Sequence, residues 1–379
     1  FRKAFCAAPT CSPSRAALLT GQSPHSVGML GLAHRGHALN DYHDHIIHTL
    51  HAHGYTSALS GVQHIAHASV ETIGYHEVLT TSANAAAATA AADWIAKPKD
   101  KPFFLSVGFT RTHRTGNTDS DVQWHNHDES PLGDPRYVMP PAPLPDTPEV
   151  RQDIADFHVC ATRYDALAGQ VLRAIDEAGL ADSTLVIATT DHGIAYPGMK
   201  CNLTDHGMGV MLILRGPADT PVTGGKVVDG MVSHIDLFPT ICELVGIDAP
   251  PRLEGRSAMP LIRDETDEIN DEVYAEVTHH ASYEPKRAVR TTRWKYMRRY
   301  DDAFDRPVMP NCDDSVSKTL WHDHGWAEQR LPDECLYDLI FDPNEAHNLA
   351  DSADHAEVLE DMRHRLDAWM QRTNDPILK

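Results

Sequence analysis

Residues 184–193 read TLVIATTDHG, an apolar and β-branched run that ends directly before Asp191 and His192. The run has the length of one strand and no polar alternation, which is typical of a strand covered on both faces. In open α/β sheets, functional side chains gather at the carboxyl ends of strands, where Asp191 and His192 would lie. Taken alone, an Asp-His pair after a strand is more often an ordinary turn. The stretch nevertheless predicts an α/β sheet with a candidate site at its edge.

Strand-like and helix-like stretches alternate on both sides of this run, which predicts a mostly parallel sheet flanked by helices. The other expected strands are 55–60, 103–109 and 210–214. The expected helices are 41–53, 85–96 with a possible cap at Asn84, 150–178 and 236–245. Gly54, Gly179 and Gly246 follow three of these helices, where a C-terminal cap belongs. Residues 115–148 have no period and predict a long surface loop.

After residue 262 the sequence no longer alternates between strand-like and helix-like stretches. An acidic stretch at 264–272 is followed by three short strand-like segments, at 273–278, 287–293 and 294–300, and by a closing helix at 355–373. Adjacent short strands without helices between them favour an antiparallel sheet. We therefore expect a larger α/β domain over 1–262, which would carry the candidate site, and a smaller C-terminal α+β domain over 263–379.

Charge and cysteine content exclude several classes of protein. The 379 residues include 33 basic and 54 acidic side chains, for a net charge of −21, which repels nucleic acid. No apolar run approaches the roughly 18 residues of a membrane span. The seven cysteines are scattered without CxxC pairs, so neither a disulfide framework nor a zinc knuckle is indicated.

The sharpest motif is CSPSRAALLTG at residues 11–21. It resembles the C-x-P-x-R…T-G signature of the sulfatase family, which implies an alkaline-phosphatase-like fold. The resemblance also implies that a formylglycine-generating enzyme oxidises Cys11 to formylglycine, and that Arg15 holds this residue and its sulfate. A hydrated aldehyde offers two hydroxyls, one to attack sulfur and one to expel sulfate afterwards. The alternative is a buried free cysteine at a helix start.

Residues 189–193, TTDHG, are similar to the sulfatase element that supplies metal ligands. The resemblance implies that Asp191 and His192, together with position 11, bind a divalent metal. We expect Ca²⁺. Mn²⁺ and Mg²⁺ are the alternatives, because the nitrogen ligand of His192 shifts preference away from Ca²⁺.

Three further side chains lie in stretches that resemble sulfatase elements. His113 matches the substrate-contacting histidine of P-F-F-L…H-x-P-H, and His64 matches the histidine of G-K-x-H. Lys200 matches the sulfate-contacting lysine of K-T-T-L-Y-D-x-G, where a cation would neutralise charge that develops on the sulfuryl oxygens. The resemblance implies that His113 or His64 protonates the leaving group. A lone histidine in a chain with 25 of them, or a solvated loop lysine, is the alternative in each case.

Within the sulfatase family, the sequence most resembles the N-sulfoglucosamine sulfohydrolase group. The residues that carry this resemblance are 28–32, 278–280 and 374–376. The implied substrate is a sulfated sugar or glycan that carries a sulfate ester or an N-sulfate. A homodimer is left open. A periplasmic or secreted location is expected if an export signal precedes Phe1, and a cytoplasmic one otherwise.

The sequence departs from the family pattern in two places. The family's D-D metal pair is not in this chain, so we expect that its first strand lies upstream and that the chain as given binds metal weakly. Val62 stands at the lysine of G-K-x-H, a loss of charge that Arg111 or Arg114 would have to offset. A phosphonate monoester or phosphodiester hydrolase and a binding-only relative are the alternatives. A basic cluster over 286–299 is interpreted as either a glycan subsite or a solvated strand pair.

Overall fold

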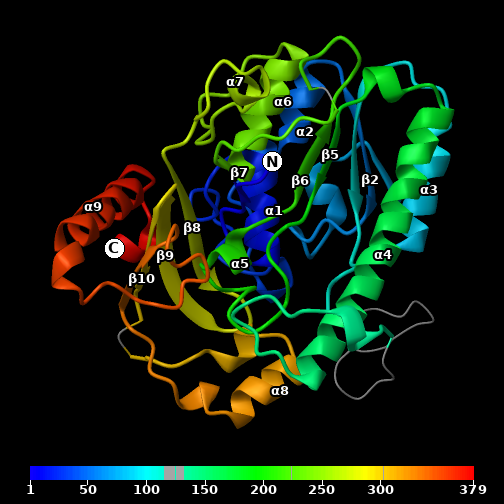
Figure 1. Cartoon of the computed structure of the whole chain (residues 1–379). Helices are drawn as coiled ribbons and strands as arrows, with labels where there is room; N and C mark the ends of the chain where they lie inside the picture. Colours follow the sequence, from blue (N-terminus) through cyan, green and yellow to red (C-terminus); the bar gives the residue numbers. More distant parts are fainter. Residues whose placement is uncertain (115–123, 125–131, 223, 302) are drawn as a thin grey trace.

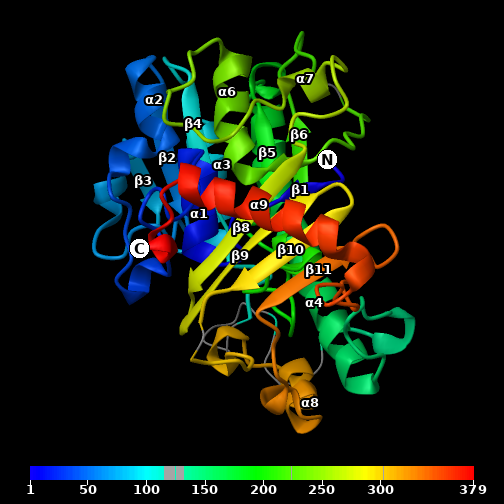
Figure 2. The same cartoon turned by 90° about the vertical axis from the view of Figure 1, so that its left-hand side faces the viewer.

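The computed structural model of the protein describes residues 1–114, 124, 132–222, 224–301 and 303–379 (Figure 1). Its N-terminal part has strands in the middle and helices on both sides. Its C-terminal part is a four-stranded antiparallel sheet with one long helix lying across it (Figure 2). Within the described residues, no helix combines the length and the apolar character that a membrane span requires.

The N-terminal part contains three groups of paired strands. Its strands are β1 (Ala4–Phe5), β2 (Thr56–Gly61), β3 (Glu77–Thr80), β4 (Phe103–Gly108), β5 (Val186–Thr189), β6 (Leu212–Arg215) and β7 (Val232–Ser233). β2 lies between β3 and β4 and is parallel to both, and β1 is parallel to β7. β5 and β6 are antiparallel to each other. The expected parallel arrangement therefore holds for every pair except the one that leads into Asp191.

Helices cover both faces of the β3-β2-β4 sheet. The N-terminal helices are α1 (Cys11–Thr20), α2 (Ile46–Ala52), α3 (Ala85–Ile95), α4 (Pro148–Glu177), α5 (Asp205–Met208), α6 (Leu237–Val245) and α7 (Met259–Ile262). Successive side chains of a strand point to opposite faces. Ala58 of β2 accordingly packs against α3 and α4, whereas its neighbour Leu59 packs in the cluster that includes α1 and α2.

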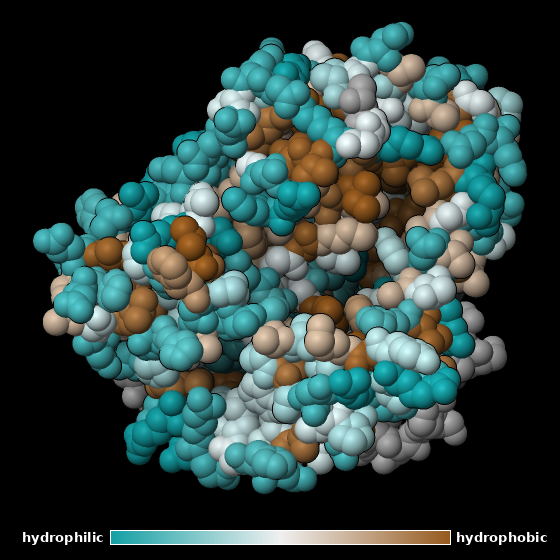
Figure 3. All heavy atoms as spheres, viewed as in Figure 1, coloured by the Kyte–Doolittle hydropathy of each residue, from teal (hydrophilic) through white to brown (hydrophobic). Residues whose placement is uncertain are grey.

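Two strand predictions need correction, because the side chains of β4 and β5 are mostly half-buried rather than covered on both faces. β4 lies at the edge of its sheet, and β5 pairs with β6. Apolar side chains gather around β5 and β6, where the surface is hollowed (Figure 3). Ile213 of β6 is 58% exposed.

Several helix ends differ from their predictions. Gly179 and Gly246 have the positive φ values, 70° each, of the expected caps. The helix predicted over 41–53 is shorter, because α2 begins at Ile46 after a 3₁₀ turn. Asn84 occupies the expected N-cap position of α3, but its side chain makes no capping hydrogen bond. Its Oδ1 accepts hydrogen bonds from the backbone N–H groups of Thr110 and Arg111, so it supports the segment after β4. Of the loop predicted over 115–148, residues 115–123 and 125–131 lie outside the described residues.

The C-terminal part is the predicted antiparallel sheet with one strand more than expected. Its strands are β8 (Glu272–His279), β9 (Tyr283–Thr291), β10 (Trp294–Arg299) and β11 (Glu334–Asp338), in the order β11-β10-β9-β8, and its helices are α8 (Val316–Asp323) and α9 (Ala356–Arg372). Leu359, Met362 and Leu366 of α9 pack on Val289 and Tyr296 of the sheet. The domain boundary at 262/263 falls directly after α7 and stays a prediction.

Both interpretations of the basic cluster over 286–299 are wrong for its central members. Lys286, Arg287, Arg290 and Lys295 are all buried. Arg290 Nη2 lies 2.8 Å from an Asp205 carboxylate oxygen, and Lys295 also pairs with Asp205. These side chains are therefore neither a glycan subsite nor a solvated pair of strands. Arg290 and Lys295 fasten the C-terminal sheet to Asp205 at the start of α5.

Candidate active site

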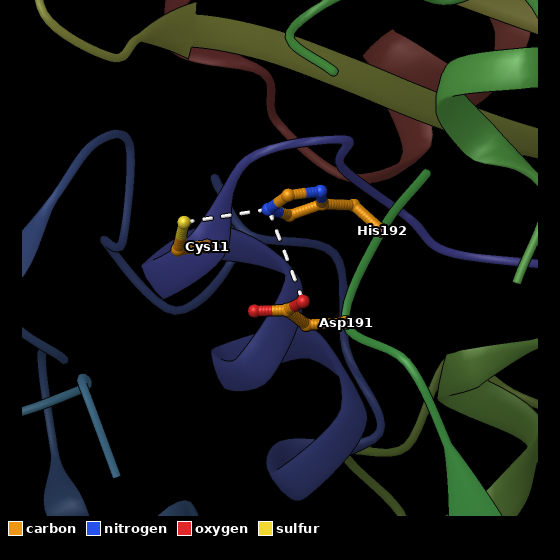
Figure 4. Close-up of side chains that lie close together, drawn as sticks. All are labelled: Cys11, Asp191 and His192. Carbon is orange, nitrogen blue, oxygen red and sulfur yellow. Dashed lines mark hydrogen bonds and ion pairs between the residues drawn. The ribbon is translucent and has the colours of Figure 1, made fainter. Parts of the chain in front are cut away.

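The structure brings together three of the predicted residues at the first turn of α1. Cys11 begins this helix, and Asp191 and His192 follow β5 (Figure 4). His192 Nε2 lies 3.3 Å from Cys11 Sγ and 3.8 Å from Asp191 Oδ1. Residues 180 positions apart in sequence thus meet because α1 packs beside the end of β5.

Arg15 lies one turn further along α1 and contacts the same carboxylate. Its Nε lies 2.9 Å from Asp191 Oδ2. The hydroxyl of Ser14 also donates a hydrogen bond to the Asp191 backbone carbonyl. α1 is therefore tied through two side chains to the segment that bears Asp191 and His192.

The charged side chains of this group shift one another's pKa values. Burial alone would raise the pKa of the Cys11 thiol, but Lys200 and His192 bring it well below its usual value. Burial would lower the pKa of His192, whereas Asp191 and Cys11 raise it to about 9. Burial would raise the pKa of Asp191, and His192 and Arg15 lower it. The site therefore stabilises the negative charges of Cys11 and Asp191 and the positive charge of His192.

The donor set of this group fits a divalent cation. His192 Nδ1 lies 2.8 Å from the Gly193 carbonyl, which leaves Nε2 directed at Cys11 and Asp191. The ligand atoms of Cys11, Asp191 and His192 all lie within 4.8 Å of one another. The negative potential that holds a proton on His192 would equally stabilise a metal ion. Hard cations take six or more ligands, so these three would form part of a coordination shell.

Lys200 and His113 lie beside this group. Lys200 is 3% exposed, so it is not a solvated loop lysine, and its Nζ lies 3.5 Å from His113 Nε2. His113 Nδ1 lies 2.6 Å from the Arg114 carbonyl, which turns Nε2 towards Lys200. Burial would lower the pKa of Lys200, but Cys11 and Asp313 raise it above its usual value. The side chain is therefore a buried cation near position 11.

His64 lies beside this group and contacts His34. Its Nε2 lies 3.0 Å from Nδ1 of His34, and the two rings stack. The backbone N–H of Ala33 donates to Ser12 Oγ, so His34 and His64 lie next to the first turn of α1. His34 is a neighbour that the sequence did not single out.

Arg114 does not supply the charge that Val62 lacks. Its Nη2 lies 2.7 Å from Asp153, its Nε donates to the Ala195 carbonyl, and its guanidinium lies over the Trp124 ring. The expectation that Arg114 reaches into the site is wrong, because these buried partners hold it elsewhere.

Besides His34, two further residues at the site were missed. Asp313 Oδ2 lies 2.7 Å from Lys200 Nζ, although the two are 113 positions apart. His234 Nε2 lies 3.0 Å from Thr189 Oγ1, and its Nδ1 lies 3.4 Å from Ser14 Oγ. Burial lowers the pKa of His234 to about 4, so it is a neutral link behind Asp191. His234 lies in the apolar 232–240 segment and could have been suspected as a buried histidine. No pattern marks Asp313.

Comparisons with known proteins identify the family to which the chain belongs. The Sulfatase family model matches residues 1–247, and the model "N-sulphoglucosamine sulphohydrolase, C-terminal" matches residues 200–311. Human N-sulphoglucosamine sulphohydrolase is 29% identical over 99% of this chain and 84% of its own length. An ulvan-active sulfatase of Formosa agariphila is 25% identical over 99% of this chain and 73% of its own.

Solved structures confirm the fold. A 2-O GAG sulfatase superposes with a TM-score of 0.70 at 21% identity, over 99% of this chain and 84% of that one. A protein in complex with its substrate D-glucosamine-2-N,6-O-disulfate superposes with a TM-score of 0.68 at 15% identity, over 100% and 91%. Because the Sulfatase model spans well over half of the residues and the human relative aligns along nearly all of them, this chain belongs to the sulfatase family of sulfuric ester hydrolases.

Proposed function

We propose that this sulfatase hydrolyses the N-sulfate of an amino sugar related to glucosamine, with a sugar sulfate ester as the second candidate substrate. The observation that carries the proposal is the convergence of Cys11, Asp191, His192 and Lys200 at one end of α1. The match of residues 200–311 to the N-sulphoglucosamine sulphohydrolase model supports the amino sugar. Neither a phosphonate hydrolase nor a binding-only relative is favoured by the comparisons.

Membership of the family implies a formylglycine and a metal. We propose that Cys11 is the residue that a formylglycine-generating enzyme converts, which would supply a geminal diol for attack on sulfur. Asp191 and His192 would hold the metal, expected to be Ca²⁺, which would polarise the sulfuryl oxygens.

The remaining residues bind the anion and move a proton. Arg15 and Lys200 are both cationic side chains close enough to interact with position 11, so they would neutralise the sulfuryl oxygens as negative charge develops. His113 Nε2 faces the site because Nδ1 donates to a backbone carbonyl, so we assign to the imidazolium form of His113, protonated on both nitrogens, the transfer of its Nε2 proton to the leaving nitrogen or oxygen. His64, held by His34, would contact the sugar beside α1.

The test begins with the mass of the tryptic peptide Ala4–Arg15 after co-expression with a formylglycine-generating enzyme. An aldehyde at position 11 is expected. The modified protein is then offered N-sulfoglucosamine, glucosamine 6-sulfate and an aryl phosphonate ester. Preferential release of sulfate from N-sulfoglucosamine supports the proposal. A thiol that persists, or turnover of the phosphonate alone, would overturn it.

A further inference from the structure

The Lys200 ammonium has one anionic partner that comes from the C-terminal part of the chain. Asp313 lies in the turn between the 3₁₀ segment Met309–Asn311 and α8, and its carboxylate is 2.7 Å from Lys200 Nζ. The Lys200 side chain is 3% exposed and that of Asp313 is 19% exposed. The pair is therefore largely shielded from water, at the position where Lys200 also meets His113.

The turn that bears Asp313 is fixed on both sides. Before it, the Asn311 side chain accepts a hydrogen bond from the Ser282 N–H and donates one to Glu284 Oε2, 2.8 Å away in each case. After it, Ser315 Oγ caps α8 by accepting from the Lys318 N–H at 3.0 Å. Asn311 and Ser315 are both buried. The carboxylate of Asp313 is thus presented from a rigid support.

Lysine needs such a support more than arginine does. Its ammonium sits on a flexible four-carbon stem, and a buried cation without a partner is costly. The ammonium has three donors, so one can remain on Asp313 while the others reach sulfuryl oxygens.

We propose that Asp313 is a positioning residue, which holds the Lys200 ammonium beside His113 in the place where it meets the sulfate group. The inference rests on the proposed function of Lys200 as a sulfate contact. It assigns to the C-terminal part of the chain a direct share in the geometry of the catalytic site. Asp313 itself is not assigned a contact with substrate.

Asp313 could instead compete with sulfate for Lys200, and this role predicts the opposite effect on sulfate binding. If Asp313 merely competed with sulfate for Lys200, removal of its charge would tighten sulfate binding. If it positions Lys200, removal of its charge would weaken binding, because the ammonium would lose its fixed location. Inorganic sulfate, a product of the proposed reaction, distinguishes the two roles without any need for turnover.

The experiment compares Asp313→Asn with Asp314→Asn in the full chain. Asp314 is the matched control, because it is the next residue and its side chain is 80% exposed in an ion pair with Lys318. By calorimetric titration with sodium sulfate, we expect the Kd of Asp313→Asn to rise roughly tenfold, as for loss of one charged hydrogen bond. Its kcat/KM should fall by about 10- to 100-fold, as for a displaced catalytic group. Asp314→Asn should match the wild type in both.

A double-mutant cycle tests that Asp313 acts through Lys200. In a Lys200→Met background, Asp313→Asn should have no further effect on sulfate affinity. A lower Kd in Asp313→Asn, an equal effect of Asp314→Asn, or an undiminished effect in the Lys200→Met background would each overturn the inference. A wild type that binds sulfate without hydrolysing any ester or sulfamate overturns the proposed function alone, since the binding comparison still decides the role of Asp313. A wild type that does not bind sulfate overturns both.

Discussion

The Nε of Arg15 lies 2.9 Å from Oδ2 of Asp191, and this contact joins the helix that begins at Cys11 to the segment that bears two candidate metal ligands. Both side chains are about a quarter exposed or less. The pair therefore works at short range in a partly desolvated site, where the geometry of the guanidinium matters as much as its charge.

Arg15→Lys should keep the positive charge and lose the planar set of donors. We expect kcat/KM to fall by about 100-fold or more, comparable to removal of one donor from a preorganised site. Arg35→Lys is the control, because Arg35 is exposed and its Nη1 donates to a backbone carbonyl. The measurement is steady-state release of sulfate from N-sulfoglucosamine. Equal losses in the two variants would contradict a specific role for Arg15.

Asp205→Asn should destabilise the protein by about 3 kcal/mol, because it leaves Arg290 and Lys295 buried beside a neutral amide. The free energy of unfolding would be measured by denaturation in guanidinium chloride. Asp264→Asn is the control. Its carboxylate is 81% exposed in an ion pair with Lys226, so its loss should change the free energy of unfolding by less than about 0.5 kcal/mol. Similar values for both variants would mean that the buried pairs add no net stability.

The elements that could be predicted from the sequence are those with a clear helical period or a continuous apolar run. The helix expected over 150–178 is α4, from Pro148 to Glu177, and the strand expected over 55–60 is β2, from Thr56 to Gly61. β11 was not predicted, because its five residues, ECLYD, are flanked by irregular chain and contain neither a long apolar run nor a regular alternation.

The site was harder to predict wherever a residue acts through a distant partner. Cys11, Asp191 and His192 were found because each lies in a recognisable motif. Asp313 was missed because its ion pair with Lys200 spans 113 positions and no local pattern encodes it. The basic cluster was misinterpreted for the same reason, since its buried acidic partners lie in other elements.

Removal of divalent metal should abolish hydrolysis, because Asp191 and His192 are proposed to hold the cation that polarises the sulfuryl oxygens. We expect EDTA to reduce sulfate release to background and added Ca²⁺ to restore it. Asp191→Asn should raise the concentration of Ca²⁺ needed for restoration, whereas Asp182→Asn, on a surface turn, should leave it unchanged. Full activity after exhaustive chelation would contradict the metal assignment.

The buried ion cluster around His25 should make stability depend on pH. His25 Nδ1 lies 2.9 Å from Glu276 Oε1, and Arg287 pairs with both Glu276 and Asp375 in the same cluster. Burial would lower the pKa of His25, but Glu276 raises it above the usual value. A raised pKa in the folded state means that the imidazolium contributes its full stability below about pH 6.5 and loses it as the pH rises through the folded pKa. His25→Gln should therefore lower the Tm at pH 6 and flatten the fall in Tm from pH 6.5 upwards. His43→Gln is the control, because His43 Nδ1 makes a similar contact with a carboxylate, 2.8 Å from Asp41 Oδ1, while its side chain is 80% exposed. A wild-type Tm that does not fall above pH 6.5 any more than that of His25→Gln would show that His25 is not charged in this cluster.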